Sequence, residues 1–133
     1  MISREFIWPI RVYWEDTDAS GVVYHANYLR WFERARTEWL RARGLNQEDL
    51  RHQEGVAFTV ANLHVDYVRP ARLDDDLVIQ TRLSAIGRAS VEFEQRLRRA
   101  GGDEELARLQ ARVACVDAAS FKPRALPKNF PRE

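Results

Sequence analysis

One amphipathic helix pattern, followed only by strand patterns, constrains the fold more than any other feature of the sequence. After residue 27 the apolar side chains recur at three- and four-residue steps, at Tyr28, Trp31, Phe32, Ala35 and Trp39. Asn27 suits the N-cap, and Gly44 suits the C-terminal stop. The pattern predicts a helix of about 16 residues, roughly 24 Å long. Its apolar face is wide and aromatic, so the helix must be buried against another layer.

Strand patterns lie on both sides of this helix. Apolar residues alternate with other residues from Trp8 to Trp14, where Pro9 belongs near the start of a strand or at a sheet edge. After a short second helix around Asn46 to His52, the sequence predicts four more strands. These are Val56 to Tyr67, ended by Pro70, then Leu77 to Leu83, Ala89 to Leu97 and Leu106 to Val116, the last two joined by a hairpin turn at Gly101 and Gly102.

This order of elements favours the α+β class. A strand, one long helix and four hairpin-linked strands predict an antiparallel β-sheet wrapped around one long central α-helix, which is the hotdog fold. The 133 residues, 1–133, fit a single domain. Because the face of the sheet opposite the helix would stay partly exposed in a monomer, we expect a homo-oligomer, either a dimer or a tetramer.

Charge and cysteine content exclude several classes of partner. Lys and Arg number 21 against 20 Asp and Glu, a formal net charge of +1, so we expect no binding to nucleic acid. Cys115 is the one cysteine, which excludes an intrachain disulfide and fits a cytoplasmic protein. The sequence contains no signal-peptide pattern and no apolar run long enough to span a membrane. The proline-rich end from Lys122 onward reads as a tail lying on the domain.

The segment DTDASGVVYHANY, residues 16–28, is the strongest candidate for a chemical site. It places Asp16 and Asp18 after a strand and immediately before a helix. A helix start carries unpaired N–H donors and partial positive charge, so it can polarise a carbonyl that a nearby carboxylate attacks. The alternative is purely structural, because Asp and Ser are also common capping and turn residues.

The sequence resembles a known family over nearly its whole length. The run VYWEDTDASGVVYHANYLRWFERARTEWLRARGL, Val12 to Leu45, is similar to the hallmark motif of hotdog thioesterases of the 4-hydroxybenzoyl-CoA thioesterase type. It is closer still to the Tol-Pal-associated YbgC branch. The segments Val65 to Thr81 and Phe121 to Phe130 extend this resemblance.

The resemblance implies hydrolysis of acyl-CoA thioesters to free acid and coenzyme A. It assigns Asp18 as nucleophile or general base and the backbone N–H of His25 as the donor that polarises the thioester carbonyl. It also places Val23 and Tyr24 near the acyl group. No cofactor and no metal are expected, and acyl carrier protein is a possible partner.

The phosphates of coenzyme A call for basic contacts. The candidates are Arg88, Ser90, Lys122, Arg124 and Lys128, with solvated surface charge as the alternative interpretation of each.

Three other functional hypotheses compete with a thioesterase. The Asp16-x-Asp18 pair also fits the nucleophile motif of haloacid-dehalogenase phosphatases, but those enzymes need a parallel sheet with alternating helices. A hotdog dehydratase would need a catalytic His near the helix with a following Pro-Gly, which is not evident. A non-catalytic acyl-carrier or envelope-complex binding module of the same fold stays open. Asp74, Asp75 and Asp76 are interpreted as a polar turn, not a metal site.

Overall fold

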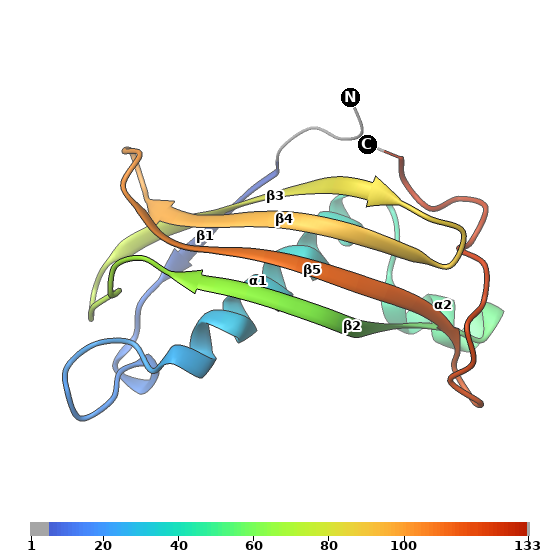
Figure 1. Ribbon diagram of the computed structural model, residues 1–133, viewed down its shortest axis with the longest axis horizontal. Helices are drawn as coiled ribbons and strands as arrows, with labels where there is room; N and C mark the ends of the chain where they lie inside the picture. Colours follow the sequence, from blue (N-terminus) through green and yellow to red (C-terminus); the bar gives the residue numbers. More distant parts are fainter. Residues whose placement is uncertain (1–5, 133) are drawn as a thin grey trace.

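The amphipathic pattern forms one long helix, α1 (His25–Ala42), in a computed structural model that describes residues 6–132. All five predicted core positions of α1 are buried. The helix ends where predicted, since Gly44 follows the C-cap Arg43 with a φ of +86° that favours glycine. Figure 1 shows α1 lying across one face of a curved sheet.

The start of α1 corrects the prediction that Asn27 is the N-cap. The helix begins two residues earlier, with Tyr24 at the N-cap position. Asn27 lies in the first turn, and its buried side-chain Nδ2 donates a hydrogen bond of 3.0 Å to the carbonyl of Asp16. The side chain thus fastens the preceding loop to the helix and does not cap the helix backbone.

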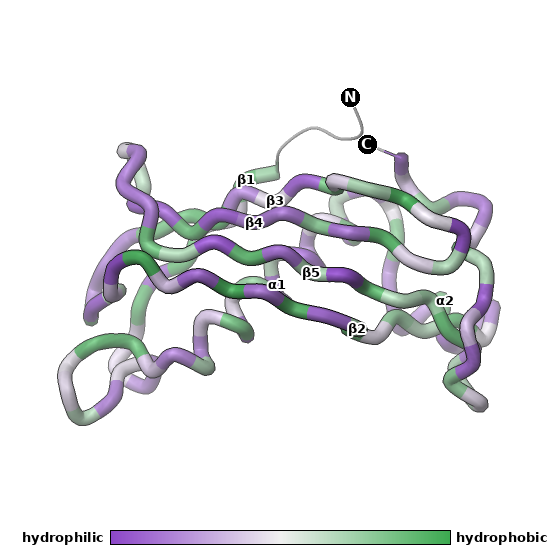
Figure 2. Tube along the Cα trace, in the orientation of Figure 1, coloured by the Kyte–Doolittle hydropathy of each residue, from purple (hydrophilic) through white to green (hydrophobic). Residues whose placement is uncertain are grey.

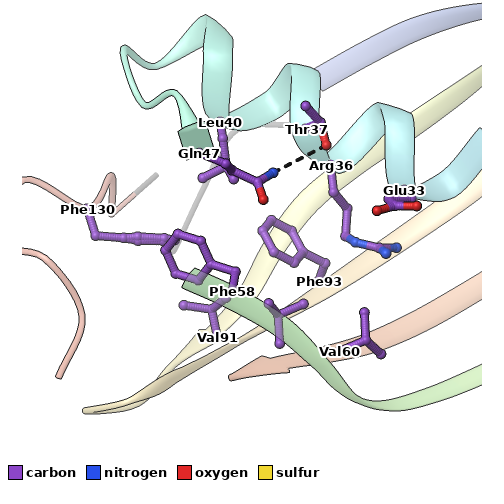
Figure 3. A pocket seen from close by; sticks show the side chains of 11 residues that line it. Glu33, Arg36, Thr37, Leu40, Gln47, Phe58, Val60, Val91, Phe93 and Phe130 are labelled. Carbon is purple, nitrogen blue, oxygen red and sulfur yellow. Dashed lines mark hydrogen bonds between the residues drawn. The ribbon is translucent and has the colours of Figure 1, made fainter. Parts of the chain in front are cut away.

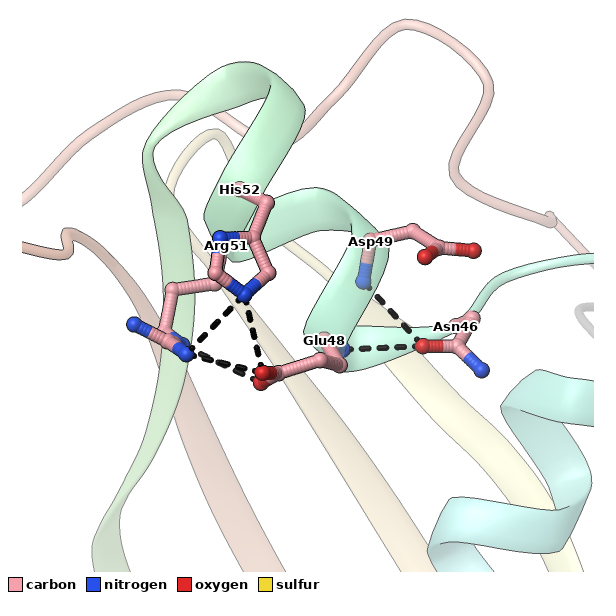
Figure 4. A network of polar contacts seen from close by, with 5 residues as sticks. All are labelled: Asn46, Glu48, Asp49, Arg51 and His52. Carbon is pink, nitrogen blue, oxygen red and sulfur yellow. Dashed lines mark hydrogen bonds and ion pairs between the residues drawn. The ribbon is translucent and has the colours of Figure 1, made fainter.

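The second predicted helix is confirmed as α2 (Gln47–Glu54). Asn46 caps it, with Oδ1 accepting from the amides of Glu48 and Asp49 at 2.9 and 3.1 Å (Figure 4). On the surface of this helix, Glu48 bonds both Arg51 and His52. Gly55 ends the helix with a φ of +66°.

Five strands form a single antiparallel sheet in the order β1-β3-β4-β5-β2. The strands are β1 (Phe6–Arg11), β2 (Val56–Tyr67), β3 (Asp76–Ile86), β4 (Ser90–Arg99) and β5 (Glu105–Asp117). The predicted hairpin between β4 and β5 is confirmed, with Gly101 at a φ of +74° in its turn. The α+β hotdog fold is therefore confirmed, with β1 and β2 as the two edge strands.

The first strand is shorter than predicted. It ends at Arg11, and Trp14 to Asp16 form a single 3-10 turn in which Trp14 is 82% exposed. The amide of Tyr13 donates to Oδ2 of Asp16, while the carbonyl of Trp14 accepts from the backbone and side chain of Thr17. These local hydrogen bonds turn the chain, so the alternation of apolar residues through Trp14 misled the prediction.

The two faces of the sheet differ in polarity. The face toward α1 is apolar, apart from a buried polar group made by Thr81, Gln95 and Arg36 of the helix. The outer face carries ion pairs such as Arg82 with Glu94 and Arg96 with Glu105. Figure 2 shows the resulting alternation of hydrophilic and hydrophobic residues along β4 and β5.

The aspartate turn and the tail lie as predicted. Asp74 and Asp75 occupy the turn before β3, where Asp75 pairs with Arg99 and Asp76 pairs with Arg11. The tail folds back on the domain, with Pro123 bridged to Val116 and Phe130 buried. Between residues 6 and 132 no helix is long and apolar enough to cross a membrane.

Candidate active site

The Asp-rich loop is a closed structure that leads directly into α1. The amide of Asp18 donates to the carbonyl of Val22 at 2.8 Å, and Gly21, at a φ of +84°, donates back to the carbonyl of Asp18. The amide of Val23 reaches the carbonyl of Ala71, so the loop is joined to the segment before β3. Together these bonds fix the position of Asp18 relative to the start of the helix.

The Asp18 side chain is fully exposed, yet it is oriented by a neighbour. Ser20 donates to its Oδ1 twice, from the amide at 2.8 Å and from Oγ at 2.5 Å. These two bonds are the main cause that lowers the pKa of Asp18, and His25 lowers it further through its charge. A backbone contact from Val22 also lowers this pKa, and the carboxylate is therefore ionised at neutral pH.

The helix start offers two backbone donors next to this loop. The amides of His25 and Ala26 occupy the first two positions of α1 and donate to no acceptor among residues 6–132. Val23 is buried in the core, whereas Tyr24 is half exposed, and its ring lies 4.5 Å from that of His25. Val23 and Tyr24 were both predicted to contact the acyl group, and of these two residues only Tyr24 is exposed enough to do so directly.

Two tyrosines hold the helix start against the sheet. Tyr67, at the end of β2, donates its hydroxyl to the carbonyl of His25 at 2.9 Å. The hydroxyl of Tyr28 accepts from the amide of Ala71, and the two tyrosine rings meet edge to face at 5.1 Å. Burial raises the pKa of both hydroxyls, so both stay protonated. No local sequence pattern gives Tyr67 a role in the site, because its role depends on the long-range contact with His25.

The predicted coenzyme A contacts gather at the other end of the molecule. The carbonyl of Arg88 accepts from Leu126 in the tail, while the Arg124 guanidinium donates to the carbonyl of Gly55 and pairs with Asp117. Lys122 lies exposed in the same turn. Ser90 begins β4 beside them. The Asp18 loop contacts the segment just before β3, and Arg88 follows the end of β3. Within one chain, Asp18 and the predicted coenzyme A contacts are therefore separated by about the length of this strand, roughly 33 Å.

A pocket between α1 and β2 was not predicted from the sequence. It has a volume of about 60 Å³ and is lined mainly by apolar side chains, together with Glu33, Arg36, Thr37 and Gln47. A larger pocket of about 660 Å³ lies on the other side of α1 along β1, and neither pocket includes Asp18. One sequence feature could have indicated this pocket. Arg36 is a charged residue that lies next to Ala35, within the apolar face of the predicted helix.

Comparison with known proteins finds relatives that cover nearly the whole chain. The model of the thioesterase-like superfamily matches residues 12–132. The Haemophilus influenzae "Acyl-CoA thioesterase YbgC" is 48% identical, covering 97% of this chain and 93% of the relative. An Escherichia coli "Acyl-CoA thioester hydrolase YbgC" is 49% identical, covering 96% and 94% respectively. Among solved structures, a probable thioesterase from Bartonella henselae superposes with a TM-score of 0.87 at 38% identity, covering 93% of this chain and all of its own.

Proposed function

The chain belongs to the thioesterase-like superfamily as a YbgC-type hotdog thioesterase, and from this premise we propose that Asp18 and the start of α1 together hydrolyse acyl-CoA thioesters. The products are a free acid and coenzyme A. The observation that carries the proposal is the ionised carboxylate of Asp18 beside two unpaired helix-start amides. A thioester is an activated acyl donor, so a site without a Ser-His-Asp triad is sufficient.

The carboxylate of Asp18 supports two routes to the same products. As a nucleophile, it adds to the acyl carbon, the C–S bond breaks, the thiolate of coenzyme A leaves, and water then hydrolyses the mixed anhydride. As a general base, it takes a proton from a water molecule that attacks the same carbon. Both hydrogen bonds from Ser20 go to Oδ1, so we assign Oδ2 as the oxygen that acts in either route.

The start of α1 supplies the electrostatic part of the mechanism. The thioester oxygen becomes negative as the acyl carbon is attacked, and the amide of His25 is positioned to donate to it. One such donor is worth about 2.7 to 4 kcal/mol of transition-state stabilisation. The hydrogen bond from Tyr67 to the carbonyl of His25 keeps this turn in place. The role of the His25 side chain is secondary, because the donor is its backbone.

The exposure of Asp18 indicates that the complete site includes a second copy of the chain. Charge stabilisation by backbone donors is strongest where water is excluded, and one chain leaves this carboxylate in water. The edge strand β2 is 12 residues long and exposes apolar side chains at Val60, Leu63 and Tyr67. Antiparallel pairing of β2 with its symmetry mate would bury these residues in a homodimer.

The same pairing would also join the two groups of site residues. Because the β2 strands run in opposite directions, the start of one strand, beside Gly55 and Arg124, meets the end of the other, beside Tyr67 and His25. Arg88, Ser90, Lys122 and Arg124 of one subunit would then contact coenzyme A phosphates while Asp18 of the other cleaves the thioester. Val23 supports the loop from the core, and Tyr24 borders the acyl group.

The substitution Asp18→Asn tests the proposal directly. It removes the charge at nearly constant volume, so we expect kcat to fall at least about a hundredfold, at the lower end of acid–base contributions. Release of free thiol from a panel of acyl-CoA and acyl carrier protein thioesters is the measurement. Asp16→Asn is the matched control, because Asp16 lies in the same loop and bonds the amide of Tyr13.

Two outcomes would reject the mechanism. Turnover by Asp18→Asn at the wild-type rate would remove Asp18 from the chemistry. Binding of acyl-CoA by the wild-type protein without any release of thiol would instead favour the non-catalytic acyl-carrier binding module.

A further inference from the structure

The pocket between α1 and β2 has one polar end and one aromatic end. Figure 3 shows Arg36 and Glu33 at one end, next to Val60, and Phe130 at the other. The walls between them are apolar, with Phe58 and Phe93 facing the interior. At about 60 Å³ the pocket has room for the end of an apolar chain that carries a polar group.

Arg36 is buried and has more hydrogen-bond donors than partners among residues 6–132. The residue is 8% exposed, and among residues 6–132 its guanidinium donates one hydrogen bond, from Nη1 to Oε1 of Gln95 at 2.9 Å. Burial lowers the pKa of the guanidinium, and the charge of Glu33, an exposed residue that forms no salt bridge with Arg36, partly offsets this effect. A buried guanidinium has five N–H donors and pays a large desolvation cost when it is unpaired. The vacant donors of Arg36 therefore favour an anionic oxygen ligand.

An apolar strip on β2, which the proposed homodimer would enclose, connects this pocket with the start of α1. Val60 borders the pocket, and Leu63, Val65 and Tyr67 follow it on the same face of β2, opposite the buried Ala111, Leu109 and Ala107 of β5. Tyr67 ends the strip at the carbonyl of His25. Along the helix, Arg36 lies about 16 Å from His25. An acyl chain attached at the proposed site can follow the strip to Arg36.

We propose that Arg36 binds a carboxylate at the far end of the acyl chain, so that the preferred substrates are coenzyme A monothioesters of medium-length dicarboxylic acids. This inference rests on the proposed function, because it places the thioester at Asp18. The guanidinium pairs with the distal carboxylate through its free donors, and the apolar strip contacts the methylene groups. Gln95 keeps the guanidinium oriented through bonds to Thr81 and to the carbonyl of Phe32.

Pairs of substrates that differ in one carboxylate test this selectivity. Adipoyl-, suberoyl- and sebacoyl-CoA are compared with hexanoyl-, octanoyl- and decanoyl-CoA. We expect at least one dicarboxylic substrate to exceed its unsubstituted partner in kcat/KM by about tenfold to a hundredfold, the range of charged hydrogen bonds. Equal or lower values for all three pairs would overturn the inference while leaving the proposed function in place.

Variants at the polar end of the pocket separate recognition from folding. Arg36→Met removes the charge and should lower the ratio of kcat/KM for suberoyl-CoA to kcat/KM for octanoyl-CoA to about one. Glu33→Gln changes an exposed residue and should increase the preference, because the pocket becomes more positive. If Arg36→Met fails to fold, the Glu33→Gln variant still tests the inference. An unchanged ratio of kcat/KM between the dicarboxylic and the unsubstituted substrate in that variant would count against a carboxylate bound at Arg36.

Binding to the Asp18→Asn protein gives an answer that does not depend on turnover. We expect suberoyl-CoA to bind more tightly than octanoyl-CoA in calorimetry. Equal affinities would refute the role of Arg36 even if the wild-type protein hydrolysed both. Tighter suberoyl-CoA binding without any wild-type hydrolysis would support Arg36 recognition and reject the proposed function alone.

Discussion

At the scale of single residues, Ser20 sets the ionisation of the proposed catalytic carboxylate. Its amide and hydroxyl both donate to Oδ1 of Asp18, and hydrogen bonds to the charged form lower a carboxyl pKa. The ionised form is the reactive one in either route. Activity should therefore be present above the pKa of Asp18 and be lost as the pH falls through it.

The substitution Ser20→Ala should move the acidic limb of the pH profile. Without the hydroxyl donor, the pKa of Asp18 rises toward its usual value, so kcat/KM begins to fall at a higher pH and stays near the wild-type value at neutral pH. The pH dependence of kcat/KM for one acyl-CoA is the measurement. Ser120→Ala is a matched control, because Ser120 makes the same kind of bond to Asp117 in the tail. An acidic limb that does not move would contradict the role of Ser20.

The sequence located the Asp18 loop but not the roles of all the residues around it. The roles proposed for Asp18 and His25 came from the resemblance of residues 12–45 to a known family. Asn27 was misassigned because its amide serves a loop carbonyl 11 residues away in sequence. The proposed roles of Arg36 and Tyr67 depend on long-range contacts. Arg36 bonds Gln95, 59 positions away, and Tyr67 bonds His25, 42 positions away. Such contacts leave no local pattern in a single sequence.

At the scale of elements, local hydrogen bonds determined where prediction succeeded. The start of α2 lies where it was predicted, because Asn46 has a strong preference for the N-cap, whereas its end lies two residues beyond the predicted His52, at Glu54, where Gly55 adopts a positive φ. The end of β1 was not predicted correctly, because alternation continues through Trp14 while the 3-10 turn is closed by Thr17 and Asp16. Interior positions of strands followed their period of two, and the β-bulge between Val60 and Asn62 did not show in the sequence.

The N-cap of α2 gives a prediction about stability. Asn46→Ala leaves the amides of Glu48 and Asp49 without their acceptor, so the free energy of unfolding should fall by about 0.5 to 2 kcal/mol. Urea unfolding followed by circular dichroism is the measurement. Gln53→Ala, at an exposed position of the same helix, should change stability by less than about 0.5 kcal/mol. Equal losses in the two variants would mean that the cap contributes nothing specific.

At the scale of the whole molecule, the positions of charge and apolar surface bear on the homodimer that we propose. The outer face of the sheet is rich in paired charges, whereas the edge strand β2 exposes three apolar residues, Val60, Leu63 and Tyr67, of which Val60 is 44% and Tyr67 47% exposed. The sequence led us to expect association because a sheet face stays exposed. In the structure these three exposed apolar residues lie on an edge strand and not on that face. This arrangement favours a dimer formed by pairing of two β2 strands over a dimer formed by stacking of two sheet faces.

Complementation between two inactive variants tests whether the site is shared between subunits. Asp18→Asn lacks the carboxylate, and a variant with Arg88→Ala and Arg124→Ala lacks the proposed phosphate contacts. If each site takes Asp18 from one subunit and the arginines from the other, a mixed dimer contains one intact site and one doubly altered site. Refolding the two variants together should therefore restore about a quarter of the wild-type activity, since about half of the dimers formed are mixed.

A site contained within one chain predicts the opposite result. Every chain in the mixture then carries one defect, so activity stays at the mean of the two separate variants. Light scattering of the refolded mixture, compared with the wild-type protein, establishes that dimers have formed before activity is measured. Recovery to about a quarter of wild-type activity, in a protein whose Asp18 and Arg88 lie at opposite ends of β3, requires that two chains supply the two halves of each site.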